Sequence, residues 1–147
     1  MRKDKDMKVY IAAPFFNEEQ LEVVKQFEII LGQHGIEYFS PRSEGTLKQM
    51  TPEERLSKMG KVFKSNIGHM DWCTHAIVVI DGYDKGVLFE MGYLYATDKK
   101  MISYTNNYQG INVMLNEAIT CHCESMFRVL DALNGDCGDV TKTGDVT

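Results

Sequence analysis

Apolar and polar residues alternate along the chain in a way that predicts both strands and helices. Short apolar runs, typical of buried strands, cover residues 8–13, 36–40, 76–81, 101–104 and 118–122. Longer segments predict helices at residues 17–34, 52–72, around Glu90, 111–117 and 124–133. Because strand and helix alternate, we expect an α/β fold, a doubly wound parallel five-stranded sheet with helices on both faces.

Polar residues mark where two of the helices begin. Asn17 is a helix cap, with Gln20 three positions later, as in a capping box. Thr51 is followed by Pro52 and two acidic residues, which predicts the start of a long second helix. The polar stretch 43–51 ahead of that helix predicts a loop.

The composition is that of an ordinary globular protein. The chain has 147 residues, 44% of them hydrophobic and 25% charged, so we expect a single domain over 1–147 with a loose tail over 134–147. No apolar stretch approaches the roughly 20 residues that cross a bilayer, so no membrane partner is expected. The charged start 1–7 lacks the apolar core of a signal peptide, which predicts a cytoplasmic protein.

Charge and cysteine usage exclude further classes of partner. A net charge of −5 argues against a nucleic acid polymer, since duplex binding needs a basic face. The cysteines are Cys73, Cys121, Cys123 and Cys137, and in a cytoplasmic protein we expect reduced thiols. They and the neighbouring histidines match no CxxC or HxxxH spacing, so no metal is expected.

Chemistry is expected at one edge of the predicted sheet. Ligands of parallel sheets bind beyond the carboxyl ends of the strands, and here the segments 14–17, 40–43 and 81–86 follow strands. The helix after the third segment carries Glu90, the only carboxylate of an otherwise apolar run. Because an unpaired buried charge is costly, this carboxylate is expected to have a task.

Asp84 lies six positions before Glu90, and Gly86 between them allows the backbone to turn sharply. Two carboxylates facing one pocket suit glycosyl transfer, in which one attacks the anomeric carbon and the other handles the proton on the leaving group. The spacing alone also fits a solvated aspartate beside a core glutamate that is paired with a lysine or a tyrosine.

Aromatic residues accompany the same edge. Phe15 and Phe16 follow the first strand and suit stacking on a planar heterocycle, and Tyr10 suits a hydrogen bond to a carboxylate, although core packing by itself is the better explanation. Neither a dinucleotide fingerprint nor GxxxxGK[ST] occurs, so no nucleotide cofactor is expected. The absence of GxSxG leaves a serine hydrolase unsupported.

Five segments carry a resemblance to a known family. They are KVYIAAPFFNEEQ at 8–20, FSPR at 39–42, VFKSN at 62–66, DKGVLFEMGY at 84–93 and INVM at 111–114. In order and spacing they are similar to nucleoside 2-deoxyribosyltransferases. The resemblance implies a flavodoxin-like or Rossmann-like fold and the exchange of purine or pyrimidine bases on 2-deoxyribose without a cofactor.

The resemblance also implies roles for matched residues. Glu90 matches the nucleophile, which forms a covalent deoxyribosyl ester and gives net retention after two inversions. Asp84 matches an aspartate that binds the base and assists its protonation. Tyr10 matches a tyrosine that orients the nucleophile, and Phe16 matches an aromatic residue near the base.

Asn112 matches an asparagine that the family contributes from a neighbouring subunit, and Met114 lies beside it. The resemblance therefore implies a homo-oligomer with shared active sites that acts on deoxynucleosides and free nucleobases. Three features depart from the family. Asn66 stands where an aspartate is usual, and Glu44 or Gly45 stands where a polar residue, often glutamine, contacts the base. The family also usually has a C-terminal tyrosine or carboxylate near the nucleophile, where this sequence has Thr143 to Thr147.

Two alternatives stay open at this point. The first is a deoxynucleoside 5′-monophosphate N-glycosidase, a related hydrolase that uses the same glutamate. Such enzymes typically carry serine in place of Asn112 and a glycine- and serine-rich loop in place of residues 14–16, and both differences favour the transferase. The second is a non-catalytic nucleoside-binding module. Asn66 and the altered C-terminal tail motivate it, and the intact pair Asp84 and Glu90 argues against it.

Overall fold

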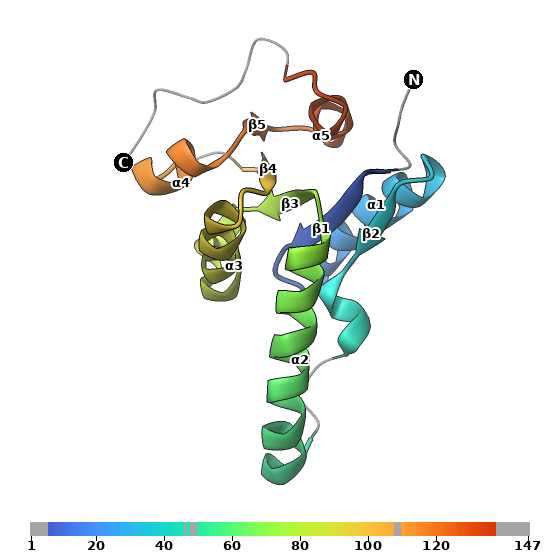
Figure 1. The fold of residues 1–147 in the computed structure, drawn as a ribbon, viewed down its shortest axis with the longest axis vertical. Helices are drawn as coiled ribbons and strands as arrows, with labels where there is room; N and C mark the ends of the chain where they lie inside the picture. Colours follow the sequence, from blue (N-terminus) through green and yellow to red (C-terminus); the bar gives the residue numbers. More distant parts are fainter. Residues whose placement is uncertain (1–5, 46, 48–49, 108–109, 138–147) are drawn as a thin grey trace.

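The computed structural model describes residues 6–45, 47, 50–107 and 110–137. These residues form a five-stranded parallel sheet in the order β2-β1-β3-β4-β5 (Figure 1). The strands are β1 (Lys8–Ala12), β2 (Glu37–Phe39), β3 (His75–Val79), β4 (Lys100–Tyr104) and β5 (Cys121–Cys123). The predicted fold class is confirmed. The tail expected over 134–147 lies outside the described residues from 138 onward.

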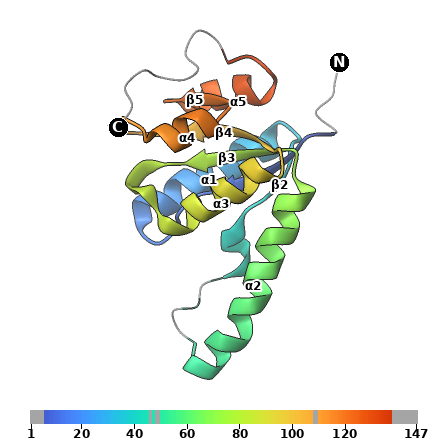
Figure 2. The same ribbon diagram turned by 60° about the vertical axis from the view of Figure 1, so that its left-hand side comes forward.

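Helices cover both faces of this sheet (Figure 2). They are α1 (Glu18–Gln33), α2 (Pro52–Trp72), α3 (Lys85–Ala96), α4 (Val113–Ala118) and α5 (Met126–Leu133). Side chains alternate along a strand, so Val9 and Ile11 of β1 meet α1 and α5, whereas Tyr10 and Ala12 meet the layer of α2, α3 and α4. This alternation turns Tyr10 toward α3, the helix that carries Glu90.

Two predicted boundaries differ from the structure. β3 ends at Val79, and Asp81–Tyr83 forms a 3-10 turn in which Gly82 and Tyr83 have φ of +79° and +49°. Pro41–Glu44 forms another 3-10 turn, so the predicted loop 43–51 is not wholly irregular. In both places a tight turn follows a strand directly, which hydrophobic periodicity does not reveal.

Side-chain caps define the starts of α1 and α2. Asn17 accepts a hydrogen bond from the Gln20 amide at 2.8 Å, but the Gln20 side chain accepts from the Phe16 amide instead of the cap residue. At α2, Thr51 and Glu54 accept from each other's backbone amides at 3.2 and 2.9 Å, which completes a capping box. Both predicted caps are thus present, but only the cap of α2 has both hydrogen bonds of a capping box.

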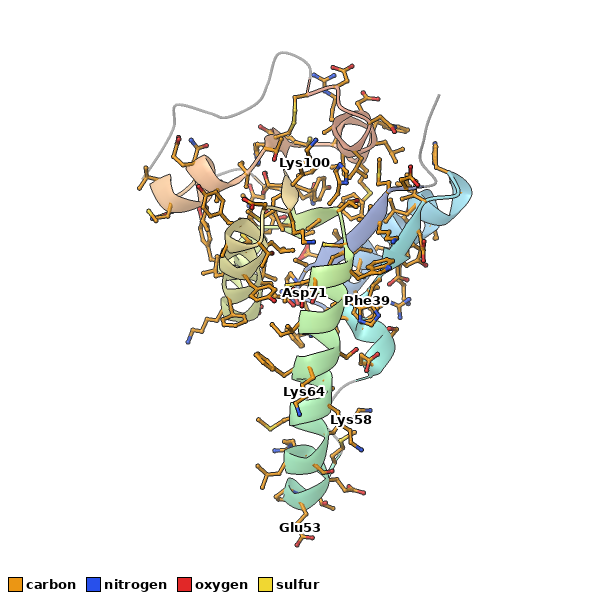
Figure 3. The ribbon with its side chains drawn as sticks, viewed as in Figure 1. Phe39, Glu53, Lys58, Lys64, Asp71 and Lys100 are labelled. Carbon is orange, nitrogen blue, oxygen red and sulfur yellow. A yellow bond between two sulfur atoms is a disulfide. The ribbon has the colours of Figure 1, made fainter. Side chains whose placement is uncertain are left out.

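The first half of α2 projects away from the sheet (Figure 1). Figure 3 shows Glu53 at the far end of this 21-residue helix and Asp71 close to the sheet. Leu56, Met59 and Phe63 are exposed on the helix, whereas Met70 in its last turns is buried. Neither α2 nor another helix of the described residues is long and apolar enough to cross a membrane.

Two of the four cysteines are paired. Cys121 of β5 forms a disulfide with Cys137, and their Cα atoms are 5.8 Å apart. After α5 the chain turns back at Gly135, whose φ of +94° suits glycine, and this turn brings Cys137 to β5. The expectation of reduced thiols is therefore wrong for this pair, whereas Cys73 and Cys123 are free and buried.

Candidate active site

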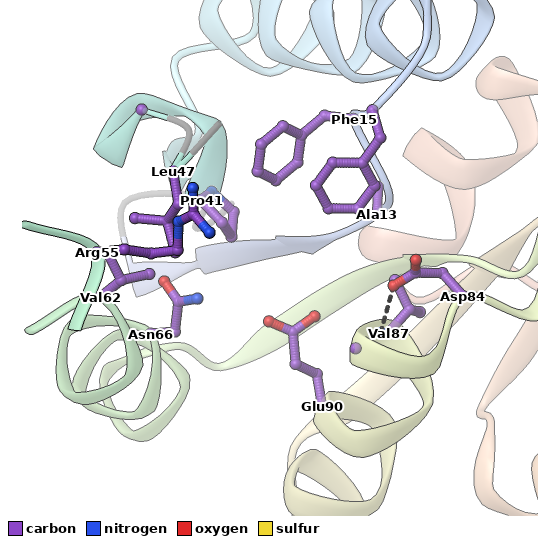
Figure 4. Close-up of a pocket in the computed structure, with 13 residues that line it drawn as sticks. Ala13, Phe15, Pro41, Leu47, Arg55, Val62, Asn66, Asp84, Val87 and Glu90 are labelled. Atoms are coloured by element: carbon purple, nitrogen blue, oxygen red, sulfur yellow. Dashed lines mark hydrogen bonds between the residues drawn. The ribbon is translucent and has the colours of Figure 1, made fainter. Parts of the chain in front are cut away.

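A cavity of about 640 Å³ lies beyond the carboxyl ends of β1, β2 and β3 (Figure 4). Six residues singled out in the sequence line it: Phe15, Phe16, Asn66, Asp84, Gly86 and Glu90. Seven other residues complete its wall: Ala13, Pro41, Gly45, Leu47, Arg55, Val62 and Val87. The cavity thus joins segments that are up to 77 positions apart, from Ala13 to Glu90.

Glu90 is held in the cavity by a residue of the central strands. It lies in the second turn of α3, and its Oε2 accepts a hydrogen bond of 2.6 Å from the Tyr10 hydroxyl. Tyr10 is fully buried in β1, where its register partner is Ala76 of β3. A rigid strand therefore fixes the direction of the Glu90 carboxylate, as a positioned nucleophile requires.

Burial makes Glu90 a weaker acid than an exposed glutamate. Loss of solvation and the nearby charge of Asp84 raise its pKa from 4.5 to about 7, although the Tyr10 hydrogen bond favours the ionised form. Burial, and next the charge of Glu90, also raise the pKa of Tyr10, which therefore stays protonated and donates. A carboxylate titrating near neutrality is suited to act as a nucleophile or to exchange a proton.

Asp84 caps the helix that carries Glu90. Its side chain accepts a hydrogen bond from the Val87 amide at 3.1 Å, which fixes the carboxylate at the start of α3. A Cβ atom at position 86 would lie 3.2 Å from Asp84 Oδ2, closer than nearly all Cβ contacts. Gly86 thus leaves room for the Asp84 carboxylate as well as lining the cavity.

The loop ahead of α3 is tied to the neighbouring strand. Asp81 accepts hydrogen bonds from the Thr105 hydroxyl and, at 2.9 Å, from the Asn106 amide. The Tyr83 hydroxyl donates to the Gly110 carbonyl at 3.1 Å. These bonds fix the turn after β3, so Asp84 and Glu90 sit on a supported element.

The walls of the cavity are largely aromatic and aliphatic. The rings of Phe15 and Phe16 lie 4.8 Å apart, and Pro41, Leu47 and Val62 contribute aliphatic surface. Asn66, on α2, is the polar group between Val62 and Glu90 in Figure 4. Its Oδ1 is buried and has no hydrogen-bond partner among the described residues. A flat ligand with polar edges matches such a space.

Besides Tyr10, which reaches the cavity through its hydrogen bond to Glu90, three candidate residues do not line it. Glu44 ends the 3-10 turn, and its neighbour Gly45 reaches the cavity in its place. Asn112 caps α4 by accepting from the Met114 amide at 2.8 Å, and Met114 is 75% exposed. Within the described chain, the site therefore contains no group from the start of α4.

Arg55 is the charged residue of the cavity wall that the sequence did not single out. It lies in the first turns of α2, and one of its guanidinium nitrogens donates to the Met50 carbonyl at 3.1 Å. Nothing in the local pattern distinguishes Arg55 from other exposed cations of α2, because its place depends on how α2 packs beside the segment after β2. The one sequence feature that could have indicated Arg55 is that α2 directly follows the segment after β2, which lines the same cavity.

The arrangement supports displacement at carbon. One carboxylate is oriented by a tyrosine, a second lies at the start of the same helix, and aromatic and aliphatic side chains form much of the wall. No group of three or more histidine, cysteine, aspartate or glutamate side chains suited to a metal occurs in the described part of the chain. The chemistry available from the protein's own residues is nucleophilic attack with proton transfer.

Comparisons with known proteins agree with this chemistry. The family model described as nucleoside 2-deoxyribosyltransferase matches residues 9–133. A solved 2-deoxyribosyltransferase from the psychrotolerant bacterium Bacillus psychrosaccharolyticus is 29% identical. The likeness covers 92% of this chain and 98% of that one, with a TM-score of 0.72.

Two more distant structures share the fold. A CMP N-glycosidase of Clostridium botulinum is 13% identical, with a TM-score of 0.58 over 86% of this chain and 98% of that one. A conserved protein of Enterococcus faecalis V583 is 18% identical, with a TM-score of 0.51 over 88% of this chain and 75% of that one. No curated protein matches the sequence.

Proposed function

The chain belongs to the nucleoside 2-deoxyribosyltransferase family, and from this premise we propose that it exchanges purine or pyrimidine bases on 2-deoxyribose. A Glu90 oxygen attacks the anomeric carbon, the bond from that carbon to the base nitrogen breaks, and the electron pair leaves with the base. An incoming base nitrogen then attacks the same carbon and releases the Glu90 carboxylate. Two inversions give net retention.

The hydrogen bond between Tyr10 and Glu90 is the observation that carries this proposal. It orients the carboxylate and favours its ionised form, which is the form that attacks. Asp84, in its protonated form, is assigned the transfer of a proton to the departing base, because it shares the cavity with Glu90. The aromatic and aliphatic wall limits water, which favours transfer over hydrolysis.

A base-exchange assay tests the function. Thymidine is incubated with uracil or adenine, and the products are separated by chromatography. We expect new deoxynucleosides from the wild type and from Glu37→Ala, which changes an exposed glutamate of β2, and none from Glu90→Ala. Exchange by Glu90→Ala at a tenth of the wild-type rate would contradict the covalent mechanism.

The same assay separates a hydrolase. The Clostridium botulinum neighbour is a CMP N-glycosidase, and the Arg55 guanidinium in the cavity could meet a phosphate. Deoxynucleoside 5′-monophosphates are therefore incubated without an acceptor base. Free base released from monophosphates alone would support the hydrolase, and saturable binding without turnover would support a non-catalytic module.

A homo-oligomer with shared sites forms the second part of the proposal. Asn112 and Met114 do not line their own chain's cavity, and Met114 is free to reach a neighbour. Exposed apolar side chains on α2 and α3, among them Phe63 at 55% and Phe89 at 56%, supply surface for a second copy.

Complementation of two variants tests the sharing. Asn112→Asp keeps the oxygen that caps α4 but removes the amide donors, and Glu90→Ala removes the nucleophile. Each variant alone is expected to be inactive. A mixture allowed to exchange subunits regains activity if one site takes Glu90 and Asn112 from different chains. No recovery in a mixture shown to contain hybrids would contradict sharing.

A further inference from the structure

The end of the cavity away from Asp84 carries polar groups that the reaction at Glu90 does not use. In Figure 4, Glu90 lies between Asp84 on one side and Asn66 on the other, with Arg55 beyond Asn66. Pro41, Leu47 and Val62 surround that end. It is therefore an apolar slot with an amide and a guanidinium at its polar positions.

The two polar groups differ in what they can recognise. Arg55 is donor-only, and among the described residues it makes one hydrogen bond, to the Met50 carbonyl, whereas a guanidinium carries five N–H groups. The Asn66 amide both donates and accepts, and its buried Oδ1 lacks a partner among the described residues. An amide pairs with either a carbonyl edge or an amino edge of a base, whereas a guanidinium pairs only with an acceptor.

The reacting carbon fixes which part of a substrate reaches this end. On the proposed function that carbon lies at Glu90. With the base directed into the slot, the far edge of its ring meets Asn66 and Arg55. Phe15 and Phe16 line the same cavity and supply ring faces for stacking. Asp84 lies on the other side of Glu90 in Figure 4.

Resting on the proposed function, we infer that Arg55, together with Asn66, selects bases with a carbonyl at that edge. Uracil, thymine and hypoxanthine offer an acceptor to Arg55 and a ring N–H to the Asn66 oxygen. Cytosine and adenine offer an amino group, which is a donor like Arg55. Neither the amino group nor the guanidinium then gains a hydrogen bond from the other.

A phosphate is the competing ligand for Arg55. A nucleotide phosphate carries up to two negative charges, and the residues described as lining the cavity include two carboxylates against the single guanidinium. That balance disfavours a dianion and leaves a neutral carbonyl as the better match. A deoxynucleoside monophosphate is accordingly included in the test.

Calorimetry with free bases tests the inference, because no turnover occurs without a deoxyribosyl donor. Wild-type protein is titrated with uracil, cytosine, hypoxanthine and adenine. We expect about tenfold tighter binding of uracil than cytosine, and of hypoxanthine than adenine, as for one hydrogen bond to a charged group. Equal binding, or tighter binding of the amino bases, would overturn the inference.

Two variants assign the selection to Arg55. Arg55→Met keeps the aliphatic stem and removes the donors, so uracil binding weakens about tenfold while cytosine binding changes little. Lys61→Met makes the same charge change at an exposed position of α2 that does not line the cavity, so binding of uracil and of cytosine is expected to stay unchanged. If Arg55→Met weakens binding of deoxyuridine monophosphate but not of uracil, the guanidinium serves phosphate and the inference fails.

The outcome is separable from that of the proposed function. Selective binding of uracil by a protein that exchanges no base would support the edge selection and contradict the transferase. Base exchange without selectivity would support the transferase and overturn the role of Arg55.

Discussion

The raised pKa of Glu90 predicts that replacing it with glutamine stabilises the protein, but only at neutral and alkaline pH. Glutamine keeps an oxygen to accept from Tyr10 and removes the charge whose burial is costly. The folded state binds the Glu90 proton more tightly than the unfolded chain, since the pKa rises from 4.5 to about 7. The associated stability is fully present below pH 4.5 and is lost as the pH rises through 7.

The size of the effect follows from that rise. Each tenfold change in a proton-binding constant is worth about 1.4 kcal/mol, so the wild type loses up to about 3 kcal/mol of unfolding free energy between pH 4 and pH 8. Glu90→Gln lacks this loss. Relative to the wild type, its unfolding free energy therefore rises by up to about 3 kcal/mol over the same interval.

Urea unfolding of both proteins from pH 4 to pH 9 measures this difference, in which the other titrating groups largely cancel. Glu37→Gln, an exposed glutamate in β2, is the matched control and is expected to show no such pH dependence. A stability difference between Glu90→Gln and wild type that stays flat with pH would refute the reasoning, since Glu90 would then titrate as an ordinary glutamate.

Two further predictions concern the acid limb of activity and the disulfide. Because Glu90 attacks in its ionised form, kcat/KM falls as the pH drops below about 7; in pH profiles Tyr10→Phe moves this limb to higher pH and Asp84→Asn moves it lower, and a shared direction would contradict these assignments. The disulfide between Cys121 and Cys137 spans 16 positions, so reduction is expected to lower the unfolding free energy by about 3 kcal/mol in urea titrations. The control is Cys137→Ser, whose urea midpoint should not respond to reductant. A wild-type midpoint that does not respond either would contradict the bond.

Local sequence signals predicted most of the helices and strands. The apolar runs at β1 and β3 and the caps Asn17 and Thr51 fix where elements begin, because strand burial and capping depend on neighbouring residues. The turn at Asp81–Tyr83 was not predicted, since its left-handed residues end the strand without a change in hydrophobicity. The disulfide was missed because it depends on how the chain turns back after α5.

Some residues of the candidate site could likewise be predicted from the sequence, and others could not. Asp84 and Glu90 follow from one loop and one helix, and the parallel pairing of β1 with β3 explains why Tyr10 reaches them. Arg55 and Val62 depend instead on the packing of a long helix beside the chain after β2, which no short spacing specifies. The spacing within one loop and helix therefore predicted Asp84 and Glu90, whereas the places of Arg55 and Val62 depend on packing between separate elements.

Mass spectrometry of the acid-quenched protein addresses covalent deoxyribosyl transfer through Glu90. The protein is mixed with thymidine alone, quenched within one turnover and digested. We expect a mass gain of one deoxyribosyl group on the peptide that carries Glu90, and its disappearance when uracil is added before the quench. Continued base exchange with no adduct on that peptide, or with the adduct on another residue, would contradict the mechanism.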